Sequence, residues 1–350
     1  MKATGGPLLS ASFLLHDLKG RAVIDDPKHP IGWIKDMPND AYHSGPGLSS
    51  TQIKVMGRSP LAYWDAYINP KREPREEKHC FAVGDGCHKL VLEPGTFEQT
   101  YAVGFDKSAH PNALDTVADL KKACSERGLM VSGSKPELAD RLLNEGGVHP
   151  SQIMLALQQM HEVTMAGRIP IAAKDYRDML GLLQAVNNDP LAGPLLDGAE
   201  TEQSYFWRCP AGVLRKCRTD AISADGEFIL DLKTTDDVSP EGFGRTIANF
   251  GYHVSAAWYL DILQGLYGHD APSGFAFIAV QKTRPYDVGV HYLTERQLHL
   301  GRLKYQKYLR TLLRCLETNI WPGATGGEFV EAKIPEWEMR KIEYLEAELL

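Results

Sequence analysis

The segments Arg218-Thr-Asp220-Ala-Ile222 and Phe228-Ile-Leu-Asp231-Leu-Lys233-Thr-Thr decide the fold class of this chain. Both are apolar enough for strands, and the short polar segment between them predicts a hairpin. Asp231 and Lys233 are two residues apart, so both side chains project from one face of their strand. Because Asp220 lies on the paired strand, we expect two carboxylates and an ammonium group to converge.

This group of side chains has the composition of a phosphodiester-cleaving site. Carboxylate oxygens suit Mg²⁺, which binds phosphate oxygens and lowers the pKa of a bound water, and a nearby Lys can orient or deprotonate that water. The pattern D-x-K is common by itself, because a carboxylate beside a Lys usually makes a surface salt bridge. Its position at the end of an apolar strand, one hairpin after Asp220, favours catalysis.

The elements around this hairpin predict an α/β fold. Besides the strand at 228–232, strands are expected at 203–208, 213–222, 275–281 and 288–292. A capped helix should begin near Leu48 and stop before Pro60. Further helices are expected at 83–92, 116–122, 135–143, 151–166, 172–186, 239–250, 253–267 and 294–318. Strands clustered in the middle and flanked by helices indicate one central sheet covered by helices.

His88 is a second candidate for the site. It lies in Val83-Gly84-Asp-Gly86-Cys-His88, within an expected helix. A lone His on a helix is more often a structural residue than a ligand, although imidazole is a common metal ligand. The glycines Gly84 and Gly86 would let another segment approach closely, which an ordinary core helix does not need. This context favours a metal-binding role for His88.

The composition limits the class of protein. With 350 residues, 43% of them hydrophobic, the chain can bury a sizeable core, and its net charge of −7 means that any DNA contact must come from local basic patches. The six cysteines form no C-x-x-C pair and are expected to be reduced. No signal peptide, P-loop motif or run of ~20 apolar residues is recognisable. We expect a cytoplasmic protein without membrane contact.

The motifs together resemble a known family. Gly84-Asp-Gly-Cys-His88, Cys217-Arg-Thr-Asp220, Asp231-Leu-Lys-Thr-Thr and Tyr252-His-Val-Ser-Ala-Ala-Trp-Tyr259 are similar, in this order, to the RecE-type exonuclease domain. This is the exonuclease VIII group of prophage recombination nucleases in the PD-(D/E)xK superfamily, so the resemblance implies a bacterial or phage-infected cell. Leu48-Ser-Ser-Thr-Gln and the segment ending in Trp321-Pro322 resemble its opening and closing segments, so the resemblance covers roughly 41–337.

The resemblance implies an activity and a set of ligands. It implies a 5′-to-3′ exodeoxyribonuclease that acts on the ends of linear double-stranded DNA and leaves a 3′ single strand for a single-strand annealing recombinase. His88, Asp220, Asp231 and the main-chain carbonyl of Leu232 would hold Mg²⁺, with Mn²⁺ expected to substitute. Lys233 would serve the attacking water.

Accessory residues and the oligomer also follow from the resemblance. Glu202 matches a family carboxylate without a firm role. The family usually has Gln where this chain has Ser255, between Tyr252 and Tyr259. If that Gln positions water or the DNA end, this contact is altered here, and Tyr259 is expected to contribute more to that positioning. A homo-oligomeric ring around DNA is a further expectation.

A small helical hairpin at 112–149 is expected as an insertion in the nuclease domain. Its two helices and the turn between them resemble a SAP motif, a small DNA-binding module, and four cations could contact phosphates: Lys121, Lys122, Arg127 and Lys135. The alternative is a surface hairpin whose charges keep it soluble, since acidic residues dilute its basic face. The predicted organisation is therefore an irregular arm at 1–47, the nuclease domain at 48–337 with this insertion, and a terminal helix at 338–350.

Two alternative functions remain open. An endonuclease or a single-strand-specific nuclease would use the same metal chemistry with different substrate access. A DNA-binding scaffold with a decayed nuclease centre is the non-enzymatic alternative, although His88, Asp220, Asp231 and Lys233 are all present. The expected helix at 294–318 carries several Lys and Arg residues that could line a DNA channel or form a solvated face.

Overall fold

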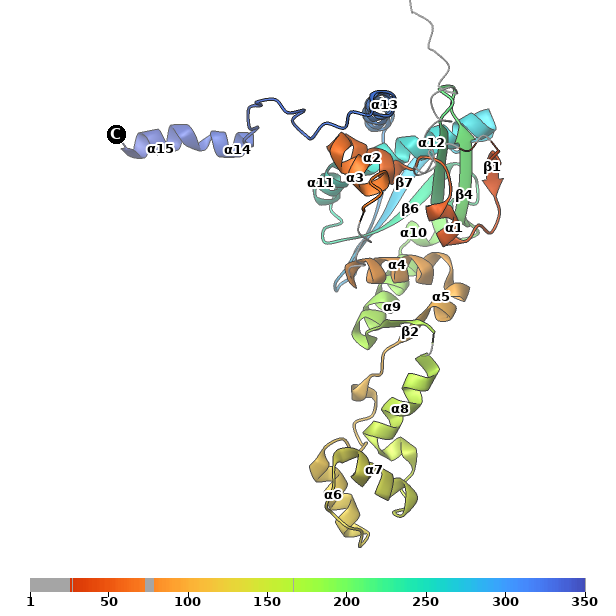
Figure 1. The fold of residues 1–350 in the computed structure, drawn as a ribbon, viewed down its shortest axis with the longest axis vertical. Coiled ribbons are helices and arrows are strands. Elements are labelled where there is room, and N and C mark those ends of the chain that lie inside the picture. Colours follow the sequence, from red (N-terminus) through yellow and green to blue (C-terminus); the bar gives the residue numbers. More distant parts are fainter. Residues whose placement is uncertain (1–25, 27, 73–78, 166, 350) are drawn as a thin grey trace, which may run out of the picture.

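A six-stranded mixed sheet forms the centre of the protein in the computed structural model, which describes residues 26, 28–72, 79–165 and 167–349 (Figure 1). The strand order is β1-β4-β5-β6-β7-β8, and only the β6–β7 pairing is parallel. The strands are β1 (Gly32–Ile34), β4 (Glu200–Arg208), β5 (Leu214–Ile222), β6 (Phe228–Thr235), β7 (Gly274–Gln281) and β8 (Val288–Tyr292). The predicted α/β fold is therefore confirmed.

Helices cover both faces of this sheet. One face packs against α2 (Ser50–Arg58), α12 (Tyr252–Tyr267) and α13 (Glu295–Thr318), and its core includes the fully buried Trp258 and Phe243. The other face packs against α4 (His79–Leu92) and α9 (Ala173–Asn188). The hairpin β5–β6 lies between these two layers, so functional groups at its open end can be reached by side chains from α4 and α12.

The start of α2 follows from its sequence. The Ser49 side chain accepts the N–H of Gln52, and the Gln52 side chain accepts the N–H of Ser49, which makes the expected helix start a capping box. The next helix, α3 (Pro60–Tyr67), was not predicted, although it begins with Ser59 as its cap and Pro60 in the first turn. These two helices and α13 form one wall of the molecule.

The segment expected to be an irregular arm contributes regular structure. Part of it, 1–25, lies outside the described residues. Beyond that part, β1 pairs antiparallel with β4, and α1 (Asn39–Ser44) buries Tyr42. The buried Lys216 donates hydrogen bonds of 2.7 Å to the carbonyls of Tyr42 and Gly45. The pairing of β1 with β4 and the contacts of Lys216 depend on residues far apart in the sequence. The local sequence pattern of this segment therefore did not predict them.

The inserted module is larger than the predicted hairpin. The parallel strands β2 (Tyr101–Val103) and β3 (Ile169–Ile171) mark where the chain leaves and re-enters the nuclease core. Between them, α6 (Val117–Glu126), α7 (Lys135–Asn144) and α8 (Met154–Met165) share a separate hydrophobic cluster around Leu120 and Leu142. Figure 1 shows α6 and α7 at the end of the molecule away from the sheet.

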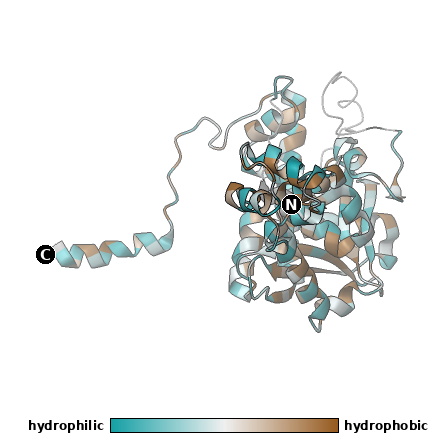
Figure 2. Cartoon of the chain, turned by 90° about the horizontal axis from the view of Figure 1, so that it is seen from below, coloured by the Kyte–Doolittle hydropathy of each residue, from teal (hydrophilic) through white to brown (hydrophobic). Residues whose placement is uncertain are grey.

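Short elements and the C-terminal segment complete the fold. They are α5 (Pro94–Thr100), η2 (Lys107–Ala109), η3 (Pro150–Gln152), α10 (Ala192–Leu196), α11 (Pro240–Phe250), η4 (Gly268–Asp270), α14 (Glu336–Met339) and α15 (Lys341–Leu349). The segment with α14 and α15 extends away from the body (Figures 1 and 2) and exposes Trp337 and Leu345. Within the described residues, every helix is too short or too polar to cross a membrane.

Candidate metal centre

The site forms where β5 and β6 separate. Their register covers Ala221 with Leu230 and Ile222 with Ile229, and the strands then diverge. In place of a ladder hydrogen bond, the N–H of Leu232 donates to Asp220 Oδ2 at 2.9 Å. Asp220 is thereby fixed at the mouth of the gap between the strands.

Three side chains with metal-binding atoms meet at this gap. One ligand atom each from His88, Glu202 and Asp220 lies within 4.8 Å of the others, and His88 Nδ1 is 3.4 Å from Asp220 Oδ2. Mg²⁺ holds oxygen ligands at about 2.1 Å, so neighbouring ligand atoms lie about 3–4 Å apart. The three groups therefore fit a single small divalent cation after slight closure.

Glu202 is held in place by an unusual backbone conformation. It lies in β4 between Thr201 and Gln203, which pair with Ala221 and Thr219 of β5, so its position is opposite Asp220. Its φ is +52°, a region that residues other than Gly rarely adopt and that is often retained at functional sites. This local distortion brings a carboxylate from the neighbouring strand into the cluster.

The electrostatics of the cluster favour a cation. Burial, together with the nearby Asp220 carboxylate, raises the pKa of Glu202 to about 8. Two adjacent carboxylates are costly to ionise together in a poorly hydrated site, and a divalent cation between them removes that cost. Burial also lowers the pKa of His88, which favours the neutral imidazole that binds metals.

Lys233 lies next to the cluster. Its Nζ contacts Asp231 Oδ1, donates to the carbonyl of Leu232 at 3.1 Å and lies 3.8 Å from Asp220 Oδ2. Burial lowers the pKa of Lys233, and the carboxylates of Asp220 and Glu202 oppose that effect. The amine is thus placed to hold or receive a proton beside the metal-binding groups.

The structure brings most of the predicted site residues together. Asp220, His88 and Lys233 meet as expected, whereas Asp231 lies outside the three-residue group found among the described residues and contacts Lys233 instead. The Leu232 carbonyl points to the same amine. Metal binding by Asp231 and by this carbonyl stays a prediction.

The residues of α12 lie on the other side of the site. Lys233 Nζ is 5.5 Å from the centre of the Tyr252 ring, and the Asp220 carboxylate contributes to raising the pKa of the buried Tyr259, after burial itself. Ser255 is buried between them on the same helix face. Ser255, where the RecE-type exonucleases that this chain resembles usually have Gln, therefore shares a helix face with both tyrosines.

Lys54 also lies near the site, although it was not predicted from the sequence. Its Nζ is 5.6 Å from the same Tyr252 ring, and burial, with Lys233 and Arg58 nearby, lowers the pKa of Lys54 to about 8. A single Lys on an amphipathic helix gives no signal of its own. Its position depends on how α2 packs beside α12.

The cations of the inserted module differ in their surroundings. Lys121 and Lys122 are exposed, whereas Lys135 Nζ is bound to Asp115 Oδ1 at 2.8 Å and Arg127 donates to the carbonyl of Ala123 at 3.1 Å. Two of the four predicted phosphate contacts are therefore already engaged within the module. DNA binding by this module stays a prediction.

The match to a family model agrees with the fold. Residues 49–329 match a family described as a PDDEXK-like domain of unknown function (DUF3799). No curated protein matches the chain. Among solved structures, a candidate exonuclease from Eubacterium rectale is 13% identical with a TM-score of 0.38, over 67% of this chain and 95% of that one. The protein SSO0001 is 16% identical with a TM-score of 0.24, over 54% and 84%.

Proposed function

The chain belongs to the PDDEXK-like family, and from that premise we propose that it is a divalent-metal-dependent exodeoxyribonuclease acting on linear double-stranded DNA. The observation that carries the proposal is the convergence of His88, Glu202 and Asp220 beside the Lys233 amine. A metal site of two carboxylates and an imidazole next to a buried Lys suits phosphodiester hydrolysis.

The side chains of the site have different roles in the proposed hydrolysis. Asp220, Glu202 and His88 would hold Mg²⁺ or Mn²⁺, which when bound polarises the phosphate and acidifies water. Lys233, held by Asp220 and the Leu232 carbonyl, orients the attacking water and can take its proton. The ring of Tyr252 lies beside this amine on the α12 side, with its centre 5.5 Å from Nζ.

The finer features of the activity rest on the resemblance to RecE-type exonucleases. We propose 5′-to-3′ polarity, a 3′ single strand as product and a single-strand annealing recombinase as partner. A ring of several copies would retain the enzyme on DNA. The exposed Lys121 and Lys122 would add contacts with the duplex away from the site.

The test is digestion of linear duplex DNA carrying a label at its 5′ or its 3′ end, beside closed circles, with Mg²⁺ or EDTA. We expect metal-dependent loss of the 5′ label from linear DNA, with Lys233→Ala lowering the rate by about 10²–10⁴. The exposed Lys307→Ala serves as the matched control and should cut at the normal rate.

The other outcomes identify the alternatives. Cutting of closed circles would replace the proposal with an endonuclease, and first loss of the 3′ label would reverse the polarity. Binding of DNA without cleavage in Mg²⁺ or Mn²⁺ would favour the alternative of a DNA-binding scaffold with a decayed nuclease centre. The convergence of His88, Glu202, Asp220 and Lys233 argues against a decayed centre.

A further inference from the structure

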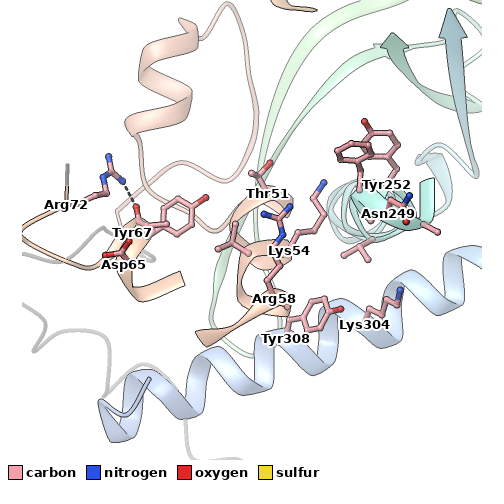
Figure 3. Close-up of a pocket in the computed structure, with 17 residues that line it drawn as sticks. Thr51, Lys54, Arg58, Asp65, Tyr67, Arg72, Asn249, Tyr252, Lys304 and Tyr308 are labelled. Carbon is pink, nitrogen blue, oxygen red and sulfur yellow. Dashed lines mark hydrogen bonds between the residues drawn. The ribbon is translucent and has the colours of Figure 1, made fainter. Parts of the chain in front are cut away.

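A cleft of about 720 Å³ opens beside Tyr252 (Figure 3). Its walls come from α2, α3, the junction of α11 with α12, and α13. Figure 3 shows Lys54 and Arg58 between Tyr67 and Tyr252, with Lys304 and Tyr308 on α13. Apart from Tyr252, the lining residues have no role in the proposed metal chemistry.

Positive charge gathers in the cleft without a matching anion. Within the described part of the chain, the side chains of Lys54, Arg58 and Lys304 have no hydrogen bond or ion pair with a carboxylate or carbonyl. The acidic residue of the lining, Asp65, accepts a hydrogen bond of 2.8 Å from Asn69. Such a gathering on a protein of net charge −7 points to an anionic ligand.

Tyr252 connects the cleft to the metal centre. The amines of Lys54 and Lys233 lie 5.6 Å and 5.5 Å from the centre of its ring. A ligand that reaches Lys54 therefore contacts the same ring that lies beside the Lys233 amine, which is expected to orient the attacking water. One strand can therefore reach both the cleft and the metal centre.

The cleft also offers an aromatic wall. Gly57 lets α2 approach α13 closely, since a Cβ at that position would lie 2.5 Å from the ring of Tyr308. The ring is thereby held at the edge of the cleft beside Lys304 and Arg58. Cations combined with an aromatic face are the features with which proteins bind unpaired nucleotides.

We propose that this cleft is the subsite for the unpaired part of the DNA strand adjoining the phosphodiester that is cut, an inference that rests on the proposed nuclease function. Lys54, Arg58 and Lys304 bind its phosphates, and a base stacks on Tyr308. Pockets of about 300–1,000 Å³ hold ligands of nucleotide size, whereas a duplex is far wider. The cleft therefore selects a single strand.

Fluorescence anisotropy of a short labelled oligothymidylate tests this subsite in EDTA, where no cleavage takes place. We expect Arg58→Ala and Lys304→Ala each to weaken binding about tenfold and to reduce the dependence of log K on log salt by about 0.7. Lys307→Ala removes an exposed cation of α13 outside the cleft and should change neither quantity. Arg58→Gln, which retains most of the side-chain stem, should behave like Arg58→Ala.

Each contrary result overturns the inference. Arg58→Ala and Lys304→Ala binding like wild type, or losing no more than Lys307→Ala, would remove the subsite. If Arg58→Ala and Lys304→Ala weakened the binding of a blunt duplex hairpin as much as that of the oligothymidylate, selection of a single strand would be refuted. Because binding is measured without metal, the test of the subsite is independent of the test of cleavage. The subsite can be refuted in a protein that cuts DNA, and it can be supported in a protein that does not.

Discussion

At the scale of single residues, Glu202 distinguishes two possible sets of metal ligands. The structure groups it with His88 and Asp220, whereas the resemblance gives the third place to Asp231. We expect Glu202→Gln to weaken Mn²⁺ binding by about tenfold or more, because it removes a carboxylate oxygen from the cluster. Calorimetric titration with Mn²⁺ measures this, and the exposed Glu200→Gln of the same strand is the control.

Asp231→Asn tests the other ligand set. If Asp231→Asn abolished Mn²⁺ binding while Glu202→Gln bound normally, the structural cluster would be wrong and the ligand set from the resemblance right. We expect Asp231→Asn to act mainly on the rate of cleavage, because this carboxylate holds the Lys233 amine. A fall in the cleavage rate with little change in Mn²⁺ affinity is the signature of that positioning role.

Lys216 provides a pH-dependent prediction away from the metal site. Burial lowers its pKa from 10.5 to about 8, so between these values the unfolded chain binds more protons than the folded protein. Stability contributed at this position therefore rises as the pH increases through that window. The Met side chain of Lys216→Met cannot titrate. We therefore expect the Tm of wild type, relative to that of Lys216→Met, to rise as the pH increases over this range.

Thermal unfolding at a series of pH values measures this gain. Lys307→Met, which replaces an exposed Lys, should run parallel to wild type throughout. A constant difference in Tm between Lys216→Met and wild type across the window would show that Lys216 does not titrate there. The two hydrogen bonds to Tyr42 and Gly45 account for a difference that does not depend on pH.

What the sequence revealed about the site depends on the range of the contacts. Asp220 and Lys233 could be predicted because one hairpin joins them, and His88 because glycines mark its helix. Glu202 reaches the cluster through a positive φ opposite Asp220, and Lys54 through the packing of α2 beside α12. Neither a backbone distortion nor packing between distant elements leaves a local pattern.

At the scale of elements, the crossing of α12 and α13 supports one wall of the cleft. A Cβ at Gly301 would lie 2.1 Å from the carbonyl oxygen of His253, so Gly301→Ala must push the two helices apart. We expect a loss of about 3 kcal/mol in the free energy of unfolding, measured by urea denaturation. Equal unfolding midpoints for Gly301→Ala and wild type would contradict this close contact.

Gly244→Ala is the matched control for that substitution. Gly244 lies in α11, where an added Cβ would meet open space. Because Ala loses less backbone entropy than Gly in a helix, Gly244→Ala should stabilise the protein by about 0.5–1 kcal/mol. The opposite signs at the two positions separate packing from helix propensity.

Elements were predictable to the extent that their own residues specify them. The capping box at Ser49 and Gln52 marks the start of α2, and apolar runs mark the central strands. β1 is three residues long and exists as the antiparallel partner of β4. The boundaries of the insertion depend on β2 pairing with β3 across the intervening residues, which a hairpin-sized pattern at 112–149 could not indicate.

At the scale of the whole molecule, the inserted module has its own hydrophobic cluster. Among the described residues, this cluster shares no member with the three clusters that pack on the sheet, so we expect the module to be separable from the nuclease core. Replacing 105–168 by a short Gly-Ser linker between β2 and β3 should therefore leave the protein folded. Binding of Mn²⁺ by His88, Glu202 and Asp220 should remain normal, because these residues lie outside the module.

The same deletion tests the role of the module in DNA binding. With Lys135 bound to Asp115, the exposed Lys121 and Lys122 are the module's predicted phosphate contacts that remain free for DNA, so the salt dependence of duplex binding should fall by about 0.9 for each. The double variant Lys121→Ala/Lys122→Ala should reproduce that loss in the full chain. If the deletion and the double variant both bound duplex with the salt dependence of wild type, the module would be a surface hairpin, and the contacts with duplex DNA would have to lie on the nuclease core, outside the cleft beside Tyr252.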